Sequence, residues 1–243
     1  MSTQNGGPGI ITTGLSLYVD PANYNTYNGG IYVYDMIGST GLTFSFQNGA
    51  SFSNTNNGTF QVDGITSTTA SSVASNILYT MTSQMTWDVW FKRTNDGNTF
   101  NMVYSNNLPY LSFRGNGLNR FLFSWYTISV SGSTQSQQTM NSPGTYSNNN
   151  WYNVTCTLFH NVASTTSTAN MYVDGLLVNT STTAIGTVDT VYQPAQSLHI
   201  GNYPGSTKYP FTGNIGAFKI YNRILSASEV LQNYNTLKSR YQN

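Results

Sequence analysis

Apolar and polar residues alternate in short segments along most of this chain, which is the pattern of half-buried β-strands. Turn-forming residues separate the segments, and Asp174-Gly175 between two apolar runs predicts a two-residue hairpin. This rhythm predicts an antiparallel two-sheet sandwich of roughly a dozen strands. The alternation is clearest at residues 31–34, 43–46, 59–62, 87–91, 110–113, 120–126 and 170–173.

A helical pattern is found near the C-terminus. Ser226-Ala-Ser-Glu229 has the form of a capping box, in which Ser226 accepts from the Glu229 N–H and the Glu229 side chain reaches back. Apolar and aromatic residues follow at helical spacing, at positions 230, 231, 234, 237 and 241. We therefore expect one short helix over about residues 227–240.

The segment before this helix, at residues 213–221, predicts the last strand of the sheet. Because successive side chains of a strand point to opposite faces, simple alternation assigns each residue to one face. It places Ile215 on the same face as Ala217 and Tyr221, and it places Phe218 and Ile220 on the other face.

Seven segments of the chain, in order, resemble the concanavalin A-like lectin/glucanase superfamily. The closing block GNIGAFKIYNRILSASEVLQNYN, at residues 213–235, is similar to the last strand and closing helix of that superfamily. The likeness is closest to laminin G-like domains of bacteriophage and marine viral (cyanophage) structural proteins. It implies an all-β fold, a two-sheet antiparallel jelly-roll sandwich with one short C-terminal helix. The other segments lie at residues 14–20, 34–38, 58–64, 85–91, 150–156 and 171–178.

The resemblance leaves no region for a second domain, so we expect one concanavalin A-like domain over residues 14–243. Residues 1–13 are polar and contain Gly6-Gly-Pro-Gly9, which is typical of an arm. We interpret them as a flexible or partner-docked N-terminal arm. The long polar segment at residues 132–150 is either a contact surface or tolerated surface variation.

Composition supports a packed β protein with an uncharged surface. Aromatic residues make up 14% of the chain, which argues against disorder. Charged residues make up only 7%, against roughly 25% in an ordinary globular protein. The net charge of +1 comes with no basic patch, so we expect no nucleic-acid partner. Weak self-repulsion favours association into an assembly.

Cellular location is predicted from segments that the sequence lacks. No signal-peptide pattern is found at residues 1–13, and no apolar run reaches membrane length. We therefore expect synthesis in the host cytoplasm and no membrane insertion. Cys156 is the only cysteine and lies in phase with strand residues, so we interpret it as a buried, inert thiol.

The residue types present in the sequence give little support for a catalytic site. Glycoside hydrolysis needs two carboxylates that flank the scissile bond. The chain has one glutamate, Glu229, which serves the predicted helix cap, and Asp88 stands alone in an aromatic strand segment. No arrangement for nucleophilic catalysis has a supporting motif. We therefore expect a protein that is not an enzyme.

The sequence leaves one hypothesis for a metal site, a structural calcium ion. His160 and His199 are far apart in the sequence and lack ligand spacing. A structural calcium ion occurs in many lectin-like relatives, and Asp20, Asp35 and Asp63 precede loops from which they could contribute. We expect no other cofactor.

Sugar binding needs an exposed aromatic ring and polar groups that orient hydroxyls. The residues that we expect in such a site are Tyr126, Asn202, Tyr203 and Tyr209. Trp125 is a further candidate for a stacking platform. The other tryptophans, Trp87, Trp90 and Trp151, lie in strand segments that are typical of the core.

Two functions remain open from the sequence. The first is a non-enzymatic phage structural protein on the virion exterior, as a capsid decoration or a tail or fibre component. In that role we expect contacts with major capsid or tail proteins, a homo-oligomer with a trimer as the default, and a host-surface glycan as a further ligand. The alternative is a free carbohydrate-binding module or lectin.

Overall fold

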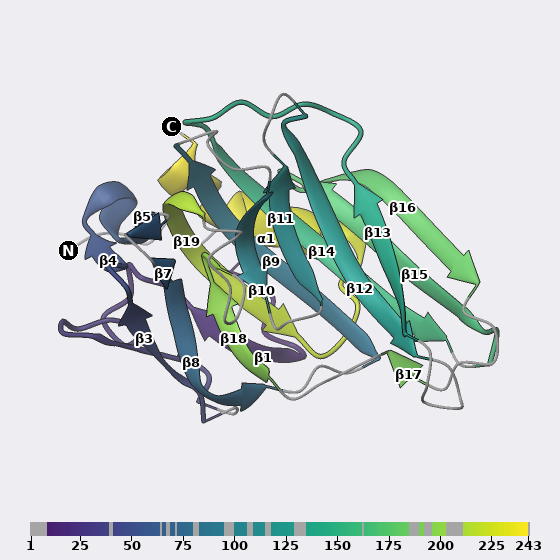
Figure 1. The fold of residues 1–243 in the computed structure, drawn as a ribbon, viewed down its shortest axis with the longest axis horizontal. Helices are drawn as coiled ribbons and strands as arrows, with labels where there is room; N and C mark the ends of the chain where they lie inside the picture. The colour runs from purple at the N-terminus through teal and green to yellow at the C-terminus, as the bar shows by residue number, and fades with distance from the viewer. Residues whose placement is uncertain are drawn as a thin grey trace.

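The computed structural model describes most of the chain as a β-sandwich with one helix on its outer side (Figure 1). The predicted fold class is confirmed, but the described part contains nineteen strands rather than about a dozen. Several of the additional strands are only two or three residues long, too short for alternation to reveal. The described residues are 9–38, 41–63, 65–66, 69–70, 72–79, 83–94, 100–105, 109–114, 118–128, 135–161, 163–184, 190–191, 196–202 and 211–242.

The first sheet has eight antiparallel strands, in the order β16-β15-β14-β9-β19-β5-β4, with β1 paired to β19. Its long central strands β14, β9 and β19 carry most of the core residues that this sheet contributes. The bounds are β1 (Leu15–Val19), β4 (Ser51–Ser53), β5 (Thr59–Asp63), β9 (Gln84–Arg93), β14 (Trp151–Asn161), β15 (Thr166–Val173), β16 (Leu176–Ala184) and β19 (Thr212–Tyr221).

The second sheet has nine strands, in the order β13-β12-β11-β10-β18-β8-β3-β2, with β17 paired to β12. A separate small hairpin is formed by β6 (Ile65–Thr66) and β7 (Thr69–Ala70). The bounds of the nine are β2 (Tyr32–Tyr34), β3 (Thr43–Gln47), β8 (Ser72–Tyr79), β10 (Phe100–Ser105), β11 (Tyr110–Arg114), β12 (Arg120–Ile128), β13 (Gln135–Asn141), β17 (Thr190–Val191) and β18 (Gln196–Ile200).

The main core fills the space between the two sheets and is rich in aromatic rings. Trp87 of the eight-stranded sheet stacks on Tyr104 of the other sheet, with ring centroids 6.3 Å apart. Trp87 also contacts Phe123, at 5.4 Å. Cys156 is fully buried in this core, as predicted. Such rings bury a large apolar area, and this burial stabilises the sandwich.

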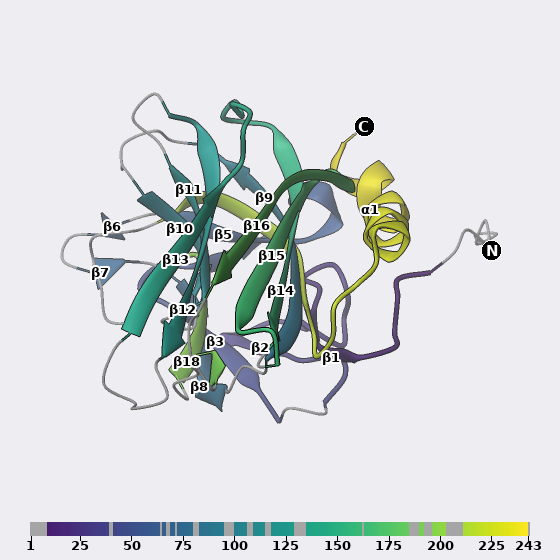
Figure 2. The same cartoon turned by 90° about the vertical axis from the view of Figure 1, so that its right-hand side faces the viewer.

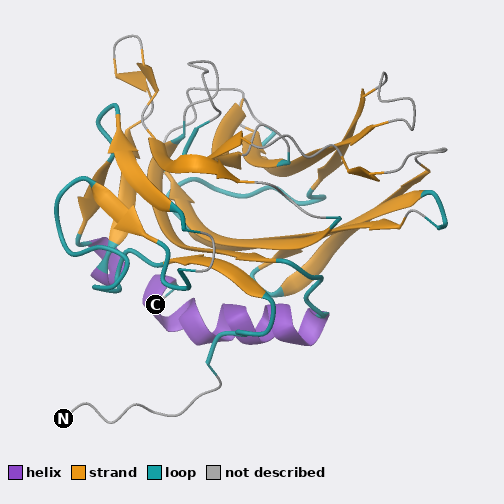
Figure 3. Cartoon of the chain, turned by 90° about the horizontal axis from the view of Figure 1, so that it is seen from below, coloured by secondary structure: helices purple, strands orange, loops and turns teal. Residues whose placement is uncertain are grey.

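Helix α1 (Ala227–Tyr241) covers the outer face of the eight-stranded sheet and makes a second core there (Figures 2 and 3). The Trp90 ring stacks on Tyr241 and on Tyr234, with centroids 4.6 and 5.6 Å apart. Trp87, Trp90 and Trp151 are all buried, as the sequence predicted. The helix is therefore attached by aromatic packing and not only by its connection to β19.

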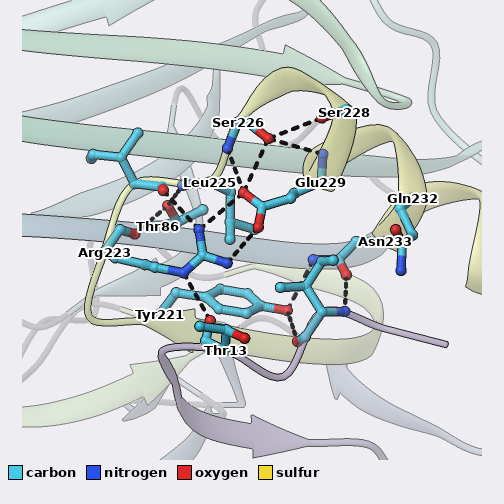
Figure 4. Close-up of polar contacts among 12 residues, drawn as sticks. Thr13, Thr86, Tyr221, Arg223, Leu225, Ser226, Ser228, Glu229, Gln232 and Asn233 are labelled. Atoms are coloured by element: carbon cyan, nitrogen blue, oxygen red, sulfur yellow. Dashed lines mark hydrogen bonds and ion pairs between the residues drawn. The ribbon is translucent and has the colours of Figure 1, made fainter.

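The predicted capping box is confirmed at the start of this helix. The Glu229 N–H donates to the Ser226 hydroxyl at 3.3 Å, and the Ser226 N–H donates to Glu229 Oε2 at 2.8 Å. Arg223 adds two parallel bonds to the same carboxylate, at 2.9 and 2.6 Å (Figure 4). These bonds hold the pKa of Glu229 at about 2. The carboxylate is thus committed to a structural role.

A β-bulge in β19 overturns the simple alternation expected for this strand. The register shifts between Ile215 and Phe218, so Ile215 joins Phe218 in the core between the sheets, while Ala217 faces the helix. The Ala217 N–H donates to the Tyr241 hydroxyl at 2.9 Å. The prediction was wrong because the extra residue, Gly216, makes room for that hydroxyl where a side chain would collide.

The described part of the predicted arm, residues 9–13, runs along the helix of the same domain. Gln232 donates to the Gly9 carbonyl at 2.7 Å, and the Ile11 N–H donates to Asn233 Oδ1 at 2.8 Å. Arg223 Nε donates to the Thr13 carbonyl at 2.9 Å (Figure 4). Residues 1–8 lie outside the described part, so docking of the arm on a partner stays a prediction.

Candidate functional site

An open pocket of about 470 Å³ lies where helix α1 ends beside the eight-stranded sheet. Four parts of the chain line it: the end of β9, the start of β14 with the loop before it, the β15–β16 turn, and the end of the helix. Its size is within the usual range for small-ligand sites. The lining residues are Lys92, Asn149, Asn150, Trp151, Tyr152, Asp174, Tyr241 and Gln242.

The backbone fixes the position of each wall. Lys92 and Trp151 are direct neighbours across the β9–β14 pair. Asn149 has a left-handed backbone, with φ of 64°, and its N–H donates to the Arg93 carbonyl at 2.7 Å. Asp174 and Gly175, with φ of 51° and 80°, make the tight hairpin turn that the sequence predicted.

Gln242 connects the end of the helix to the two strands of the pocket. Its Nε2 donates to the Trp151 carbonyl at 2.9 Å and to Asp174 Oδ1 at 3.1 Å. Its Oε1 accepts from the Tyr234 hydroxyl at 2.7 Å. The side chain is therefore held by three bonds, so this wall of the pocket is formed before any ligand arrives.

Trp151 is one of three aromatic residues that line the pocket, with Tyr152 and Tyr241. Its Nε1 donates to Asn56 Oδ1 at 3.1 Å, and its ring centroid lies 4.6 Å from that of Tyr241. Lys92 Nζ lies 5.7 Å from the same ring. The whole residue is only 8% exposed, so a ligand would contact a small part of a side chain that is already held in place.

Asp174 is the one acid among the lining residues. Its Oδ1 accepts from the Asn153 N–H at 2.9 Å and from Gln242. No described residue donates to Oδ2. Partial burial raises the pKa of this carboxyl above its usual range. Because Oδ2 has no described donor and Asp174 lines the pocket, this oxygen is available to accept a hydrogen bond from a ligand hydroxyl.

The sugar-binding residues expected from the sequence do not meet in the part of the chain that the structure describes. Asn202 is buried just after β18 and does not line the pocket. Tyr203 and Tyr209 lie outside the described residues, as does the side chain of Tyr126 in β12. That site stays a prediction.

Trp125, which we expected as a candidate stacking platform, is instead a core residue. Its side chain is fully buried, and its ring stacks on Phe123 at 5.4 Å in the core between the sheets. The reason is that Phe121, Phe123 and Trp125 alternate inward together along β12. This tryptophan therefore cannot serve as an exposed stacking platform.

The three aspartates proposed for calcium have structural partners. Asp20 accepts from Arg240 at 2.6 Å, and Asp35 accepts from the N–H groups of Tyr18 and Ile37, each at 3.0 Å. Asp63 accepts from a neighbouring glutamine side chain at 3.0 Å. Among the described residues, no group of three or more His, Cys, Asp or Glu side chains could hold a metal ion.

The lone acid of the aromatic strand, Asp88, forms a buried ion pair. Lys219 Nζ lies 3.1 Å from Asp88 Oδ2, and both side chains are fully buried. Asn153 donates to Oδ1 at 2.7 Å, and Asn233 of the helix donates to Oδ2 at 3.2 Å. This carboxylate joins the sheet to the helix and has no access to a ligand.

The pocket itself was not predicted as a site. Trp151 was assigned to the core, and Lys92 and Asp174 were not considered as ligand-binding residues. The one signal was the polar segment at residues 132–150, because Asn149 and Asn150 belong to it. In the ranges that the structure covers, no helix has the length and apolar character needed to cross a membrane.

Solved structures with similar folds include several toxin domains. The botulinum neurotoxin type G receptor binding domain matches with a TM-score of 0.62 at 17% identity, over 91% of this chain and 51% of that chain. The binding domain of Paraclostridial Mosquitocidal Protein 1 matches with a TM-score of 0.66 at 14% identity, over 92% and 52%. At such identities the likeness shows the fold alone.

A Trypanosoma rangeli sialidase matches with a TM-score of 0.63 at 14% identity, over 96% of this chain and 34% of that chain. This chain therefore spans about half the length of the toxin domains and a third of the sialidase. No curated protein sequence matches it. None of these three structures is a phage protein, so the viral part of the resemblance depends on the sequence motifs alone.

A laminin G-type family model matches residues 63–231, which is more than half of the chain. The matched region contains β9, β14 and the β15–β16 turn, and thus most of the pocket walls. The two-sheet sandwich with its closing helix agrees with this match. The chain belongs to the concanavalin A-like lectin/glucanases superfamily.

Proposed function

We propose that this domain is a non-enzymatic recognition module that binds carbohydrate in the pocket at the end of helix α1. We further propose that it is carried on the exterior of a phage virion, as a capsid decoration or a tail or fibre component. The observation that carries the binding proposal is the pocket, in which an aromatic edge, three amide side chains and a carboxylate converge on one space.

The chemistry of the pocket suits a hydroxylated ligand. A sugar ring offers an apolar face and several hydroxyls, each able to donate and accept. Trp151 supplies an apolar contact, Asn149 and Asn150 supply amide groups, and Asp174 Oδ2 supplies an acceptor. The contacts with Asn56 and Gln242 hold Trp151 and Asp174 in place, which reduces the entropy cost of binding.

The placement of the described acids supports a role without catalysis. A glycosidase needs a second carboxylate across the bond that it cleaves. Asp174 is the one acid that lines the pocket. Asp88 is enclosed under the helix, and Glu229 is bound by Arg223 and the helix cap. We therefore propose that a bound glycan is held and released unchanged.

The proposed virion location rests on the sequence motifs and on the low charge of the chain. The motifs resemble phage laminin G-like domains, and a net charge of +1 leaves little repulsion between copies. We propose a homo-oligomer, with a trimer as the default, in contact with major capsid or tail proteins. Two of the structurally similar proteins are named as binding domains, and their names agree with the recognition role proposed for this chain.

A glycan array and a cryo-EM map of the particle test the two parts of the proposal. The array would compare the unmodified protein with Asn150→Ala, and with Asn235→Ala on the exposed side of the helix as the matched control. We expect retention on specific glycans that Asn150→Ala weakens and Asn235→Ala leaves unchanged. Absence of retention on any glycan would refute the binding role.

The particle map addresses the location independently. We expect density for this fold at symmetric sites on the capsid or tail. Particles without it, together with glycan retention by the free protein, would favour the alternative of a free lectin.

A further inference from the structure

We infer that the pocket takes an acidic sugar, meaning a hydroxylated ring that carries a carboxylate, with Lys92 contacting the carboxylate and Asp174 accepting from the hydroxyls. This inference rests on the proposed carbohydrate-binding function and names its substrate class. It is carried by the presence, in one pocket, of a cation and a carboxylate that do not pair with each other.

Lys92 is the one cation among the lining residues, and no described carboxylate lies within ion-pair distance of it. Three other described cations are neutralised by ion pairs within the domain: Lys219 by Asp88, Arg223 by Glu229 and Arg240 by Asp20. In a chain with only nine Lys and Arg residues, an unneutralised ammonium at a pocket wall offers a place for an anion.

The surroundings of Lys92 favour a directed contact over a loose surface attraction. Its ammonium lies 5.7 Å from the Trp151 ring, which holds the side chain along the aromatic wall. Trp151 is itself held by Asn56 and by contact with Tyr241. An aromatic wall excludes water from one side, and a charge pair is stronger where water is partly excluded.

Asp174 decides which kind of anion fits. A simple inorganic anion would meet the Asp174 carboxylate in the same pocket and gain no hydrogen bond from it. A ligand with hydroxyls can donate to Asp174 Oδ2, while its own carboxylate lies toward Lys92. The two charges therefore orient the ligand, and the amides of Asn149 and Asn150 are available to both of its groups.

The test compares uronic-acid oligosaccharides with the same oligosaccharides after reduction of their carboxylates. Galacturonate and glucuronate oligomers would be titrated into the full chain, and binding followed by NMR. We expect the acidic form to bind about tenfold more tightly than its reduced counterpart at low salt, as one charge-assisted hydrogen bond would give. The preference should shrink as salt is added.

Two variants of one residue and a matched control identify the group responsible. Lys92→Gln removes the charge and keeps most of the side-chain length, so we expect it to abolish the preference. Lys92→Arg should retain it. Arg120→Gln is the control, because it removes the same charge from an exposed side chain on β12 of the other sheet, which does not line the pocket. This control should keep the preference.

The outcomes separate the two proposals. Equal binding of acidic and reduced oligomers, or a preference that survives Lys92→Gln, would overturn the acidic-sugar inference and leave carbohydrate binding intact. Binding of neither form, together with no retention on the glycan array, would overturn both. A urea denaturation curve for each variant confirms that a loss of binding does not reflect unfolding.

Discussion

Replacement of Lys219 is the most direct test of how helix α1 is attached to the eight-stranded sheet. Lys219 and Asp88 form a fully buried ion pair, with Nζ 3.1 Å from Oδ2. Asn153 and Asn233 donate to the same carboxylate at 2.7 and 3.2 Å. The Tyr18 ring lies 5.8 Å from the ammonium. The polar atoms of the pair are thus satisfied only by one another and by these neighbours.

The expected magnitude follows from the charge that each substitution leaves behind. Lys219→Met leaves the Asp88 carboxylate buried with two amide donors. Breaking a buried pair costs about 3–5 kcal/mol, and we expect the lower end, about 3 kcal/mol, because those two bonds remain. Asp88→Asn leaves an ammonium without a counter-charge, and we expect about 4 kcal/mol. The double variant removes both charges and should cost less than the sum by at least about 2 kcal/mol.

The assay is urea denaturation of the four proteins, followed by the fluorescence of the four tryptophans. Lys238→Met, at an exposed position of the helix, is the control and should change the free energy of unfolding by less than about 0.5 kcal/mol. Single variants that each cost under about 1 kcal/mol, or costs that simply add, would show that the pair is not the attachment we describe.

Three further predictions concern other parts of the fold. Gly216→Ala should cost about 1–3 kcal/mol, because its new Cβ would overlap the Tyr241 hydroxyl, whereas Gly144→Ala should be near neutral in the same urea denaturation assay. Burial lowers the pKa of His199 from 6.5 to about 4, so the unfolded chain binds its proton first. Stability should therefore fall by up to about 3 kcal/mol as the pH drops from 6.5 to 4, and His199→Gln should remove this part of the pH dependence. Burial also raises the pKa of Cys156 far above its usual range, so a thiol reagent should label it in urea and not in the native protein; labelling of the native protein would contradict its burial.

Short-range patterns in the sequence correctly predicted much of the local structure. The capping box depends on residues three apart, and the Asp174-Gly175 turn on two neighbours. The burial of Cys156 and Trp87 follows from period-two alternation within single strands. These features are determined by nearby residues, so they can be predicted without knowledge of the tertiary structure.

The candidate site was not predictable in the same way. Lys92, Trp151, Asp174 and Gln242 come from four separate parts of the chain, and no spacing links them. Alternation indicates which face of a strand is apolar, but it does not say what packs against that face. Trp151 was correctly assigned to the core, and only the position of the helix end reveals that its edge also forms a pocket wall.

The sequence by itself determined the strand rhythm, the C-terminal helix and the fold class, because each depends on periodicity and on local turn and cap chemistry. The tertiary structure decided the rest. Strand order brings Lys219 to Asp88 across 131 positions, and a bulge at Gly216 turns Ile215 inward so that Tyr241 can dock. Those contacts depend on which faces meet after the sheets have formed, and the pocket exists only because the helix then ends beside Trp151.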